Sequence, residues 1–587
     1  MSASGSLSSE RFSAEELPLW SGVRRLTGIR ALICLLCLEM LTGVSVHLLA
    51  GSDVVSGRQA AHLSLIRLPD CALHTTLRMA TALVLSFIFL ICCGFALAGS
   101  ERLRENILSF SDELRAVPVC GFLVFVAPLF SMLLPGHGFI GEWLTCASVF
   151  PVLAAPMMVA LLRAWGNVPD DLALVARGFR LTGWQTFWRL VVPAAIPALV
   201  RGAARAMPYA WLALLWAEIF IRHRVNFVAP GLGAYVSAAA TTGDGWPVVL
   251  AVMVMVLIVA GYDWLVFRPL LMWSERFVTK DNGQALCGAS GEPWVLRFIR
   301  RAPGIGWLGG HVQQTARALG TLRLGKNPVA VVSADVIAQP AVSETAMLTA
   351  LCTATLIFCW QPLIFHIGPG EMTRVVALGF STLLRVLVMV FLTATIWVFP
   401  GVWLGMHRGA VMKHMTLLRL PGIVPTIMLF PLVAALITTF RLSSGFWLMP
   451  LLVLGPQWFL ATRLVESVAS FPKGLFEAAR AYNIRGWMWW RSVVLPGLGE
   501  GWLAGARAAF FGAWNLAIAA EFVRWGDVRL ISDGLGSYIA EAMEGGDAVR
   551  AAFGVMVMTA FAAFFDALVW TPLAAWVRRR TTGVTVG

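Results

Sequence analysis

Long runs of apolar residues, separated by short polar stretches, dominate this 587-residue chain. A run of about 20 apolar residues can cross the hydrocarbon core of a bilayer as a helix, and in lipid only a helix satisfies every backbone polar group within one segment. The pattern therefore predicts an all-α polytopic membrane protein with about 12 transmembrane helices. The expected helices fall near 29–50, 75–99, 117–134, 143–164, 193–220 and 247–272, and near 346–366, 376–405, 421–438, 445–465, 494–520 and 549–576.

The composition excludes a water-soluble enzyme or nucleic-acid-binding protein. Hydrophobic residues make up 58% of the chain and charged residues 13%, whereas soluble domains average about 45–50% apolar and about 25% charged residues. The net charge of +13 reflects arginines that fall on one side of the membrane if the helices alternate, which places both termini in the cytoplasm. The expected surroundings are membrane lipid, with no nucleic acid. The arginines on the expected cytoplasmic side include Arg24, Arg25, Arg30, Arg102, Arg104, Arg115, Arg163, Arg177, Arg180, Arg189, Arg578, Arg579 and Arg580.

The two sets of six helices are copies of one another. Residues 171–277 align with residues 474–580 without a gap at an offset of 303, which becomes 307 upstream. An even number of helices per copy gives both copies the same orientation, and the seam between them is a natural site for a translocation path. Matching positions include Gly183 and Gly486, Trp211 and Trp514, Glu218 and Glu521, Tyr235 and Tyr538, the Gly-Leu-Gly triplets at 231–233 and 534–536, Asp263 and Asp566, and upstream Arg78 and Arg385.

The repeat divides the chain into a cytoplasmic tail (1–28), a first unit (29–277), a cytoplasmic linker (278–342), a second unit (343–580) and a C-terminal tail (581–587). The linker holds a near match to a phosphate-binding loop between Gly320 and Lys326. However, Asn327 stands where the magnesium-binding Ser or Thr belongs, and no buried strand precedes the segment. We therefore expect no nucleotide, other cofactor, metal or catalytic residue on this chain.

The loop between the fourth and fifth helices of the second unit predicts a short helix on the cytoplasmic face. Pro472 marks a helix start, and the sequence Glu477-Ala-Ala-Arg favours helix. Gly486 lies where a helix stops or turns sharply, and Pro496 lies where the next membrane helix begins. Such an element can receive a push from a cytoplasmic partner and pass it to two membrane helices.

This loop resembles the EAA loop of type I ABC importer permeases, which has Glu-Ala-Ala, a glycine seven residues after the second alanine, and then Leu-Pro. In that family the loop forms a coupling helix that docks in a groove of the ATP-hydrolysing subunit. The resemblance places one coupling helix at about 472–486 and the other at about 169–183. The matching positions are Glu477, Ala478, Ala479 and Gly486 in the second, and Ala176 and Gly183 in the first, where Leu174 and Val175 replace the glutamate and the first alanine.

Two further patterns are similar to the same family. Thr75-Thr-Leu-Arg78 and Ser381-Thr-Leu-Leu-Arg385 resemble its Thr-Leu-x-Arg motif, and Ala-Glu followed by Gly-Leu-Gly resembles the stretch that leads to its external loop. The resemblance is strongest to the nitrate, sulfonate and taurine branch. It implies two permease units fused in one chain, and a fused iron(III)-type permease is the alternative within the family.

The resemblance also implies the partners and the location. Two copies of an ABC ATP-binding subunit would carry ATP and magnesium, and an extracytoplasmic binding protein would deliver a small anion. The chain itself would be a permease and not an enzyme, in the plasma (inner) membrane of a bacterium.

Four acidic residues lie near the expected path. Glu218 and Glu521 end the fifth helix of each unit, where they line an external gate, contact a substrate-delivery protein or pair with a neighbour. Asp263 and Asp566 lie inside the sixth helix, where an ionised group costs at least about 2.5 kcal/mol, so each is expected to face protein rather than lipid. Contact between helices and contact with the substrate both remain open for these aspartates.

Two other classes of protein compete with the importer. A gradient-driven secondary transporter with two six-helix repeats needs functional charged groups at mid-membrane and has no use for the helical loop. A membrane-embedded enzyme or scaffold needs a cluster of His, Asp, Glu or Cys at one depth, and the nine histidines are scattered along the chain.

Overall fold

Seven helices among the described residues are long and apolar enough to cross a membrane, so the chain is a helical polytopic membrane protein. The expected helices near 29–50 and 346–366, and most of the one near 117–134, lie outside the described residues. The computed structural model describes residues 65–98, 140–166, 170–223, 230–274, 367–407, 421–471 and 473–582, with short pieces at 117–119, 121, 123–124, 277, 314, 318 and 320–321.

The first unit contributes four of the membrane-length helices. Its elements are η1 (Leu65–Arg67), α2 (Leu68–Ala98), α5 (Ile140–Gly166), α6 (Asp170–Gly178), α7 (Gly183–Thr186), η3 (Phe187–Val191), α8 (Val192–His223), α9 (Leu232–Thr242), α10 (Gly245–Gly261), η4 (Tyr262–Phe267) and α11 (Arg268–Ser274).

The second unit contributes the other three. Its elements are α15 (Pro369–Ile396), α16 (Val398–Met406), η7 (Thr426–Leu429), α18 (Phe430–Thr439), α19 (Ser444–Trp447), η8 (Met449–Leu452), α20 (Gln457–Ala469), α21 (Lys473–Ala481), α22 (Gly486–Trp489), η9 (Trp490–Val494), α23 (Leu495–Ala520), β1 (Phe522–Trp525), β2 (Val528–Ile531), α24 (Leu535–Gly545), α25 (Ala548–Phe565), η10 (Asp566–Trp570) and α26 (Thr571–Thr582).

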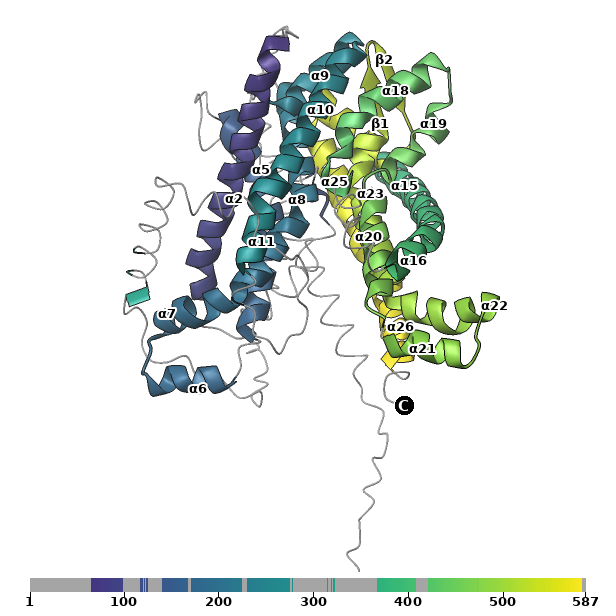
Figure 1. Cartoon of the computed structure of the whole chain (residues 1–587). Helices are drawn as coiled ribbons and strands as arrows, with labels where there is room; N and C mark the ends of the chain where they lie inside the picture. Colours follow the sequence, from purple (N-terminus) through teal and green to yellow (C-terminus); the bar gives the residue numbers. More distant parts are fainter. Residues whose placement is uncertain are drawn as a thin grey trace, which may run out of the picture.

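The two units lie side by side, the first in purple to teal and the second in green to yellow (Figure 1). The helical succession from α5 to α11 recurs from α20 to α26, interrupted only by the β1–β2 hairpin. In each unit the fifth helix, α8 or α23, holds a fully buried tryptophan, Trp211 or Trp514. Trp514 also donates its indole N–H to the backbone oxygen of Met558 at 3.0 Å. The internal repeat is therefore a repeat of structure as well as of sequence.

Four π-helical segments accommodate four of the prolines in the membrane helices. A proline lacks the backbone N–H, and its ring clashes with the carbonyl four residues earlier. In all four cases that carbonyl lies within a π-helical segment, whose wider turn gives the ring space. The segments are η3, η4, η9 and η10, and each ends two residues before its proline, at Pro193, Pro269, Pro496 and Pro572.

This accommodation moves the start of the fifth helix. The sequence predicted that the membrane helices begin near 193 and 494, but the continuous helices begin at Gly183 and Gly486. The π-turn carries the helix through the proline, so each membrane helix starts within the loop that joins it to the preceding one.

The helix expected over 445–465 is broken. Ser444–Leu452 and Gln457–Ala469 meet at a bend of 41°. Gly455 and Pro456 lie in the break, where the proline cannot donate a backbone hydrogen bond and the glycine disfavours helix. Its counterpart α5 stays continuous although it contains Pro151 and Pro156.

A two-stranded hairpin is the one departure from all-α structure among the described residues. Strands β1 and β2 pair antiparallel, with Phe522 opposite Ile531 and Trp525 opposite Val528. Gly526 in the turn has φ = 58°, a left-handed conformation that glycine adopts without strain. The sequence did not predict the hairpin, because strands of four residues give too short a pattern to recognise beside a long apolar helix.

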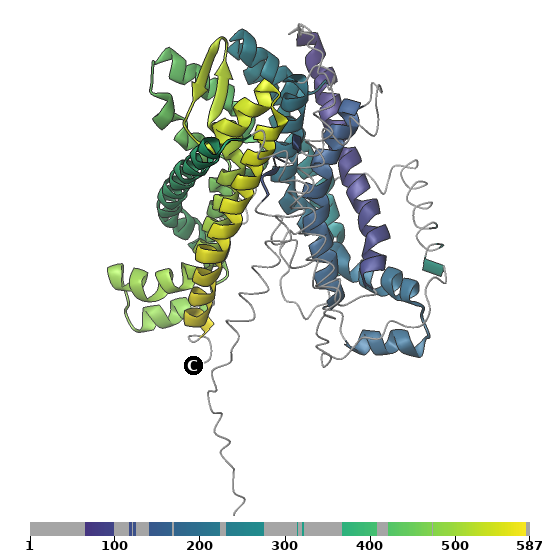
Figure 2. The same ribbon diagram turned by 180° about the vertical axis from the view of Figure 1, so that it is seen from behind.

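The hairpin and two further contacts join the units. Gly526 donates its backbone N–H to the carbonyl of Ala240, near the end of α9, at 2.7 Å. The ring of Tyr209 on α8 stacks on that of Phe459 on α20, with centroids 5.3 Å apart. The buried Asn515 side chain accepts a hydrogen bond from the backbone N–H of Val119. The hairpin contact lies at the end of the molecule opposite α6 and α21 (Figures 1 and 2).

Gly526→Ala is expected to destabilise the protein by about 1–2 kcal/mol, because an alanine in the left-handed region is strained by about that amount. Gly545→Ala is the matched control, since Gly545 ends α24 with open space around it and no positive φ. Thermal unfolding of both variants in detergent measures the difference. Equal midpoints for the two variants would contradict the assigned turn geometry.

Candidate functional site: two surface modules and two buried charge networks

Two surface modules lie at one end of the molecule, on opposite flanks and at the same end as the C-terminus (Figure 1). The first surface module is α6 with α7 (170–186), and the second is α21 with α22 (473–489). They contain residues 170–183 and 473–486 of the two segments that the sequence predicted as surface helices, whereas residues 169 and 472 lie outside the described residues. The structure therefore places both loops on one face, as two copies with the same orientation require.

Both modules end their first helix in the same way. Leu181 donates its backbone N–H to the carbonyl of Ala176 at 3.1 Å, and Ile484 does so to Ala479 at 2.9 Å. Arg180 and Asn483 precede these donors and have φ values of 50° and 54°. A left-handed residue with such a hydrogen bond is the Schellman type of helix end. The backbone of the first module is thus preserved although its sequence departs from Glu-Ala-Ala.

The second helix of each module begins at the repeated glycine. Gly183 is buried and begins α7, which Thr182 and Gln185 cap reciprocally. Gly486 is exposed, has φ = 58°, and would have no atom within 4 Å of an added Cβ. The sequence expected these glycines at a sharp turn. Gly486 makes that turn with its own backbone, and the turn leads directly into the next helix.

The residues that were predicted to contact a partner differ in exposure. Ala176 and Ala479 are buried against their own units, at 6% and 5% exposure. Glu477 and Ala478 are exposed on α21. Only the latter two side chains, of these four, are available to a partner.

The two modules also differ in how they pack. Trp184 of α7 is buried, with its ring edge-on to Phe95 of α2 at 4.9 Å. Its counterpart Trp487 is 73% exposed, and the neighbouring Met488 is 65% exposed. The second module therefore stands further from its unit and leaves an aromatic and an apolar side chain uncovered.

A piece of the linker contacts η3, directly after the first surface module. Arg189 donates its Nε–H to the carbonyl of Gly320 at 3.1 Å, and a Cβ at Gly320 would collide with Trp188. The second unit has Arg491 and Ser492 at the positions of Trp188 and Arg189. Gly320, rejected above as part of a phosphate-binding loop, is here a packing residue.

The first buried charge network surrounds Glu218. This carboxylate is fully buried and accepts hydrogen bonds from Arg78 Nη1 at 2.8 Å and from Thr75 Oγ1 at 2.9 Å. Arg78 also donates twice to Glu142, with both distances 2.5 Å. One arginine thus joins helices α2, α5 and α8, and each buried charge of the network has a partner of opposite charge.

The same network fixes the Gly-Leu-Gly triplet at the start of α9. Gly233 donates its backbone N–H to Glu218 Oε2 at 2.8 Å, and Leu232 donates to Thr75 Oγ1 at 3.0 Å. An added Cβ at Gly231 would overlap the Glu218 carboxylate, and one at Gly233 would overlap the backbone oxygen of Leu215. The glycines are required because backbone and carboxylate approach too closely for any side chain. A carboxylate at a helix N-terminus is also stabilised by the helix dipole.

The second network repeats this arrangement around Glu521, which is 2% exposed. Thr382 Oγ1 donates to its carboxylate at 2.9 Å, and Gly536 donates its backbone N–H at 2.8 Å. Arg385 Nη1 is more distant, at 3.5 Å. The offset of 307 places the uncharged Met449 where the first network has Glu142, so Arg385 loses the second carboxylate that orients Arg78.

The sequence singled out the glutamates and the arginines separately, but it did not connect them. Their role as a gate stays a prediction, because both carboxylates are buried and hydrogen-bonded within their own units. Thr75, Thr382 and Glu142 were missed as partners. The Thr-Leu-x-Arg pattern was the available signal, since positions three residues apart share one face of a helix.

The two aspartates have different partners. Asp566 in η10 accepts two hydrogen bonds from Arg507 of α23, at 2.7 and 2.6 Å. Asp263 in η4 pairs with Arg268 of the same helix, with Nε and Oδ2 3.0 Å apart. Asp566 therefore links two helices, whereas Asp263 makes a local ion pair.

A third polar cluster of the second unit was not anticipated. Tyr538 on α24 donates its hydroxyl to Glu371 Oε1 at 2.9 Å, and Arg550 Nε approaches the same oxygen at 2.9 Å. Burial and the bond to Glu371 raise the pKa of Tyr538, so it remains a donor at physiological pH. The hydroxyl of Tyr235, its counterpart, is buried without a hydrogen-bond partner.

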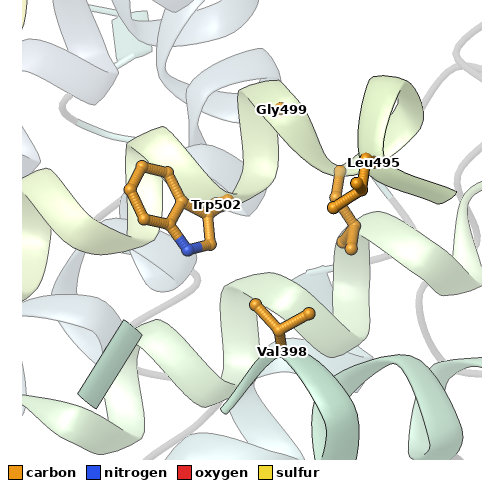
Figure 3. Close-up of a pocket in the computed structure, with 5 residues that line it drawn as sticks. Val398, Leu495, Gly499 and Trp502 are labelled. Atoms are coloured by element: carbon orange, nitrogen blue, oxygen red, sulfur yellow. The ribbon is translucent and has the colours of Figure 1, made fainter. Parts of the chain in front are cut away.

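An apolar hollow lies between α16 and α23. Val398 faces Leu495, Gly499 and Trp502 across it (Figure 3), and Leu498 completes the lining. With no charged side chain in the lining, it offers no recognition of a polar solute. In the described part of the chain, no group of three His, Cys, Asp or Glu side chains is placed to hold a metal ion.

Arg78→Met is expected to lower the free energy of unfolding by about 3–5 kcal/mol, because it leaves Glu142 and Glu218 without their cation. Arg385→Met is the matched variant and is expected to cost less, because it leaves one buried carboxylate without its cation rather than two and because its contact with Glu521 is long, at 3.5 Å. Thermal unfolding in detergent checks the ranking. A loss for Arg385→Met as large as that for Arg78→Met would contradict the asymmetry of the networks.

Comparison with known proteins gives relatives of one kind. Residues 64–268 match the family described as binding-protein-dependent transport system inner membrane component. The chain is 23% identical over 181 residues to a nitrate import permease protein of Leptolyngbya laminosa (31% of this chain, 60% of the relative). It is 25% identical over 192 residues to a bicarbonate transport system permease protein of Synechococcus elongatus (32% and 66%). It is 24% identical over 190 residues to an osmoprotectant import permease protein of Salmonella typhimurium (32% and 84%).

These matches have a defined extent. They span less than two thirds of the length of the nitrate and bicarbonate permease proteins, and no solved structure matches the chain significantly. The family match includes the first charge network, from Thr75 to Glu218, and the whole first surface module. The comparisons support the family inferred from the EAA-type loop: residues 64–268 match a transport system inner membrane component, and all three relatives are permease proteins of transport or import systems.

Proposed function

We propose that this chain is the complete transmembrane part of an ATP-driven importer, with two permease units fused in one polypeptide. The observation that carries the proposal is the pair of surface modules, which have the same helix end and lie at the same end of the molecule. The second unit lies outside the family match, but it repeats the surface module, the buried network and the π-helical segments of the first.

The surface modules are joined to the buried networks by uninterrupted helices. One runs from Gly183 to Phe220 and the other from Gly486 to Ala520. At 1.5 Å per residue each spans roughly 50 Å. Since Glu218 and Glu521 lie at the far ends of these helices, a displacement of either module reaches the network as a rigid-body movement.

The proposed mechanism uses two ATP-binding subunits, each docked on one surface module. Binding of ATP draws the subunits together, the modules follow, and the two units alternate between inward-open and outward-open states. The chain itself hydrolyses no ATP. An extracytoplasmic binding protein would deliver the substrate at the end that holds the hairpin.

The proposed substrate is a small anion of the nitrate, sulfonate or taurine type. The names of two of the relatives, which import nitrate and bicarbonate, support this class. The cytoplasmic position of both termini is likewise part of the proposal, with the C-terminus at the same end as the surface modules.

Reconstitution of the purified complex in proteoliposomes tests the proposal. Uptake of labelled nitrate, bicarbonate or taurine should require the binding protein and internal ATP. Uptake that persists without ATP and follows an ion gradient would favour the secondary transporter instead.

Gly486→Pro is expected to reduce ATP-driven uptake about tenfold or more, equivalent to losing about 1.4 kcal/mol of docking free energy. Proline fixes φ near −65° and cannot form the turn at φ = 58°. Gly486→Asn is the control, because asparagine tolerates the left-handed region, and it should retain most of the uptake. Both variants should insert in the membrane at the wild-type level. Wild-type uptake by the proline variant would contradict the role of the second module.

A further inference from the structure

The two surface modules have matching backbones but present different side chains at the same positions. Leu174 is 61% exposed on α6, where α21 exposes Glu477. These residues are related by the repeat offset of 303 and stand at the same distance from the shared helix end. A partner that docks on both modules thus meets an apolar side chain on one and a carboxylate on the other.

Two neighbouring positions differ in size and in charge. Val175 is 52% exposed on α6, whereas the smaller Ala478 occupies that position on α21. Arg180 is exposed at the end of α6, whereas the neutral Asn483 lies at the end of α21. The aromatic position is alike in both, with Phe179 and Tyr482 at 76% and 80% exposure.

A single groove would fit the two modules unequally. A basic side chain that pairs with Glu477 would be desolvated opposite Leu174 without a counter-charge, and a groove shaped for Leu174 would bury Glu477 unpaired. A groove closed tightly over Ala478 would also exclude the larger Val175. Because both modules expose an aromatic residue at the same position, the two grooves can nevertheless have the same overall shape.

We propose that the two modules dock on two non-identical ATP-binding subunits. The subunit for α21 presents a basic residue opposite Glu477 and a close-fitting groove. The subunit for α6 presents an apolar, wider groove and an acidic residue near Arg180. This inference rests on the function proposed above, and it replaces the expectation of two copies of one subunit with a heterodimer.

Contact of α6 with lipid does not account for the same observations. Module α21 has the same helix end and lies at the same end of the molecule, yet it exposes Glu477, which a hydrocarbon surface would not accept. The matching backbones point to related partners for the two helices, and protein grooves of unlike lining satisfy both.

Native mass spectrometry of the complex purified from its own host in mild detergent tests the composition. The expected result is one copy of this chain with one copy each of two different ATP-binding chains. Two copies of a single ATP-binding chain would overturn this inference and leave the proposed function intact. Absence of any ATP-binding chain, together with ATP-independent uptake, would instead overturn the proposed function and this inference with it.

Exchange of the distinguishing side chains then tests the cause. Leu174→Glu should reduce occupancy by the subunit that docks on α6 about tenfold, because it places an unpaired charge in an apolar groove. Glu477→Leu should do the same for the other subunit. Val528→Thr, at an exposed position of the hairpin at the opposite end of the molecule, is the control, and it should leave occupancy unchanged. If both exchanges leave the composition and occupancy of the complex unchanged, the inference is wrong.

Discussion

The fold of each unit depends on one buried carboxylate near the end of its central helix. Glu218 and Glu521 each accept a threonine hydroxyl, an arginine N–H and a backbone N–H from the start of the following helix. A carboxylate with no counter-charge would be very costly at such a position, so these partners must assemble together. That requirement fixes the angle at which α9 or α24 leaves the end of the fifth helix, and it accounts for the glycines that line the approach.

The two units have closely similar backbones, but their side chains differ at corresponding positions. The first network has a second carboxylate, Glu142, and the second network does not. The first surface module has Trp184 buried against its unit and Gly320 packed on the adjacent η3, whereas the second leaves Trp487 exposed. Fusion of two units in one chain would allow this divergence, because each unit then always meets the same neighbour and evolves against that neighbour alone. A dimer of identical subunits would have to satisfy both roles with one sequence.

Mechanical continuity is the feature that links the surface modules to the rest of the molecule. In each unit a single helix runs from the repeated glycine through a π-helical segment, past a proline, to the buried carboxylate. The π-turn preserves the helix at the place where a proline would otherwise break or kink it. The units meet at the other end through the hairpin turn, where a backbone hydrogen bond joins them far from the modules.

The sequence by itself determined the membrane class, the repeat, the surface helices and the resemblance to a permease family, because these follow from local patterns of hydrophobicity, proline, glycine and spacing. It identified Glu218 and Arg78 as notable but could not pair them, since their side chains meet only when α2 and α8 pack side by side. The start of the fifth helix, the break at Gly455 and Pro456, and the hairpin were also decided by the tertiary structure. In each case proline or glycine leaves part of the backbone without its usual helical stabilisation. The outcome depends on whether packing against residues distant in the chain makes up for that loss.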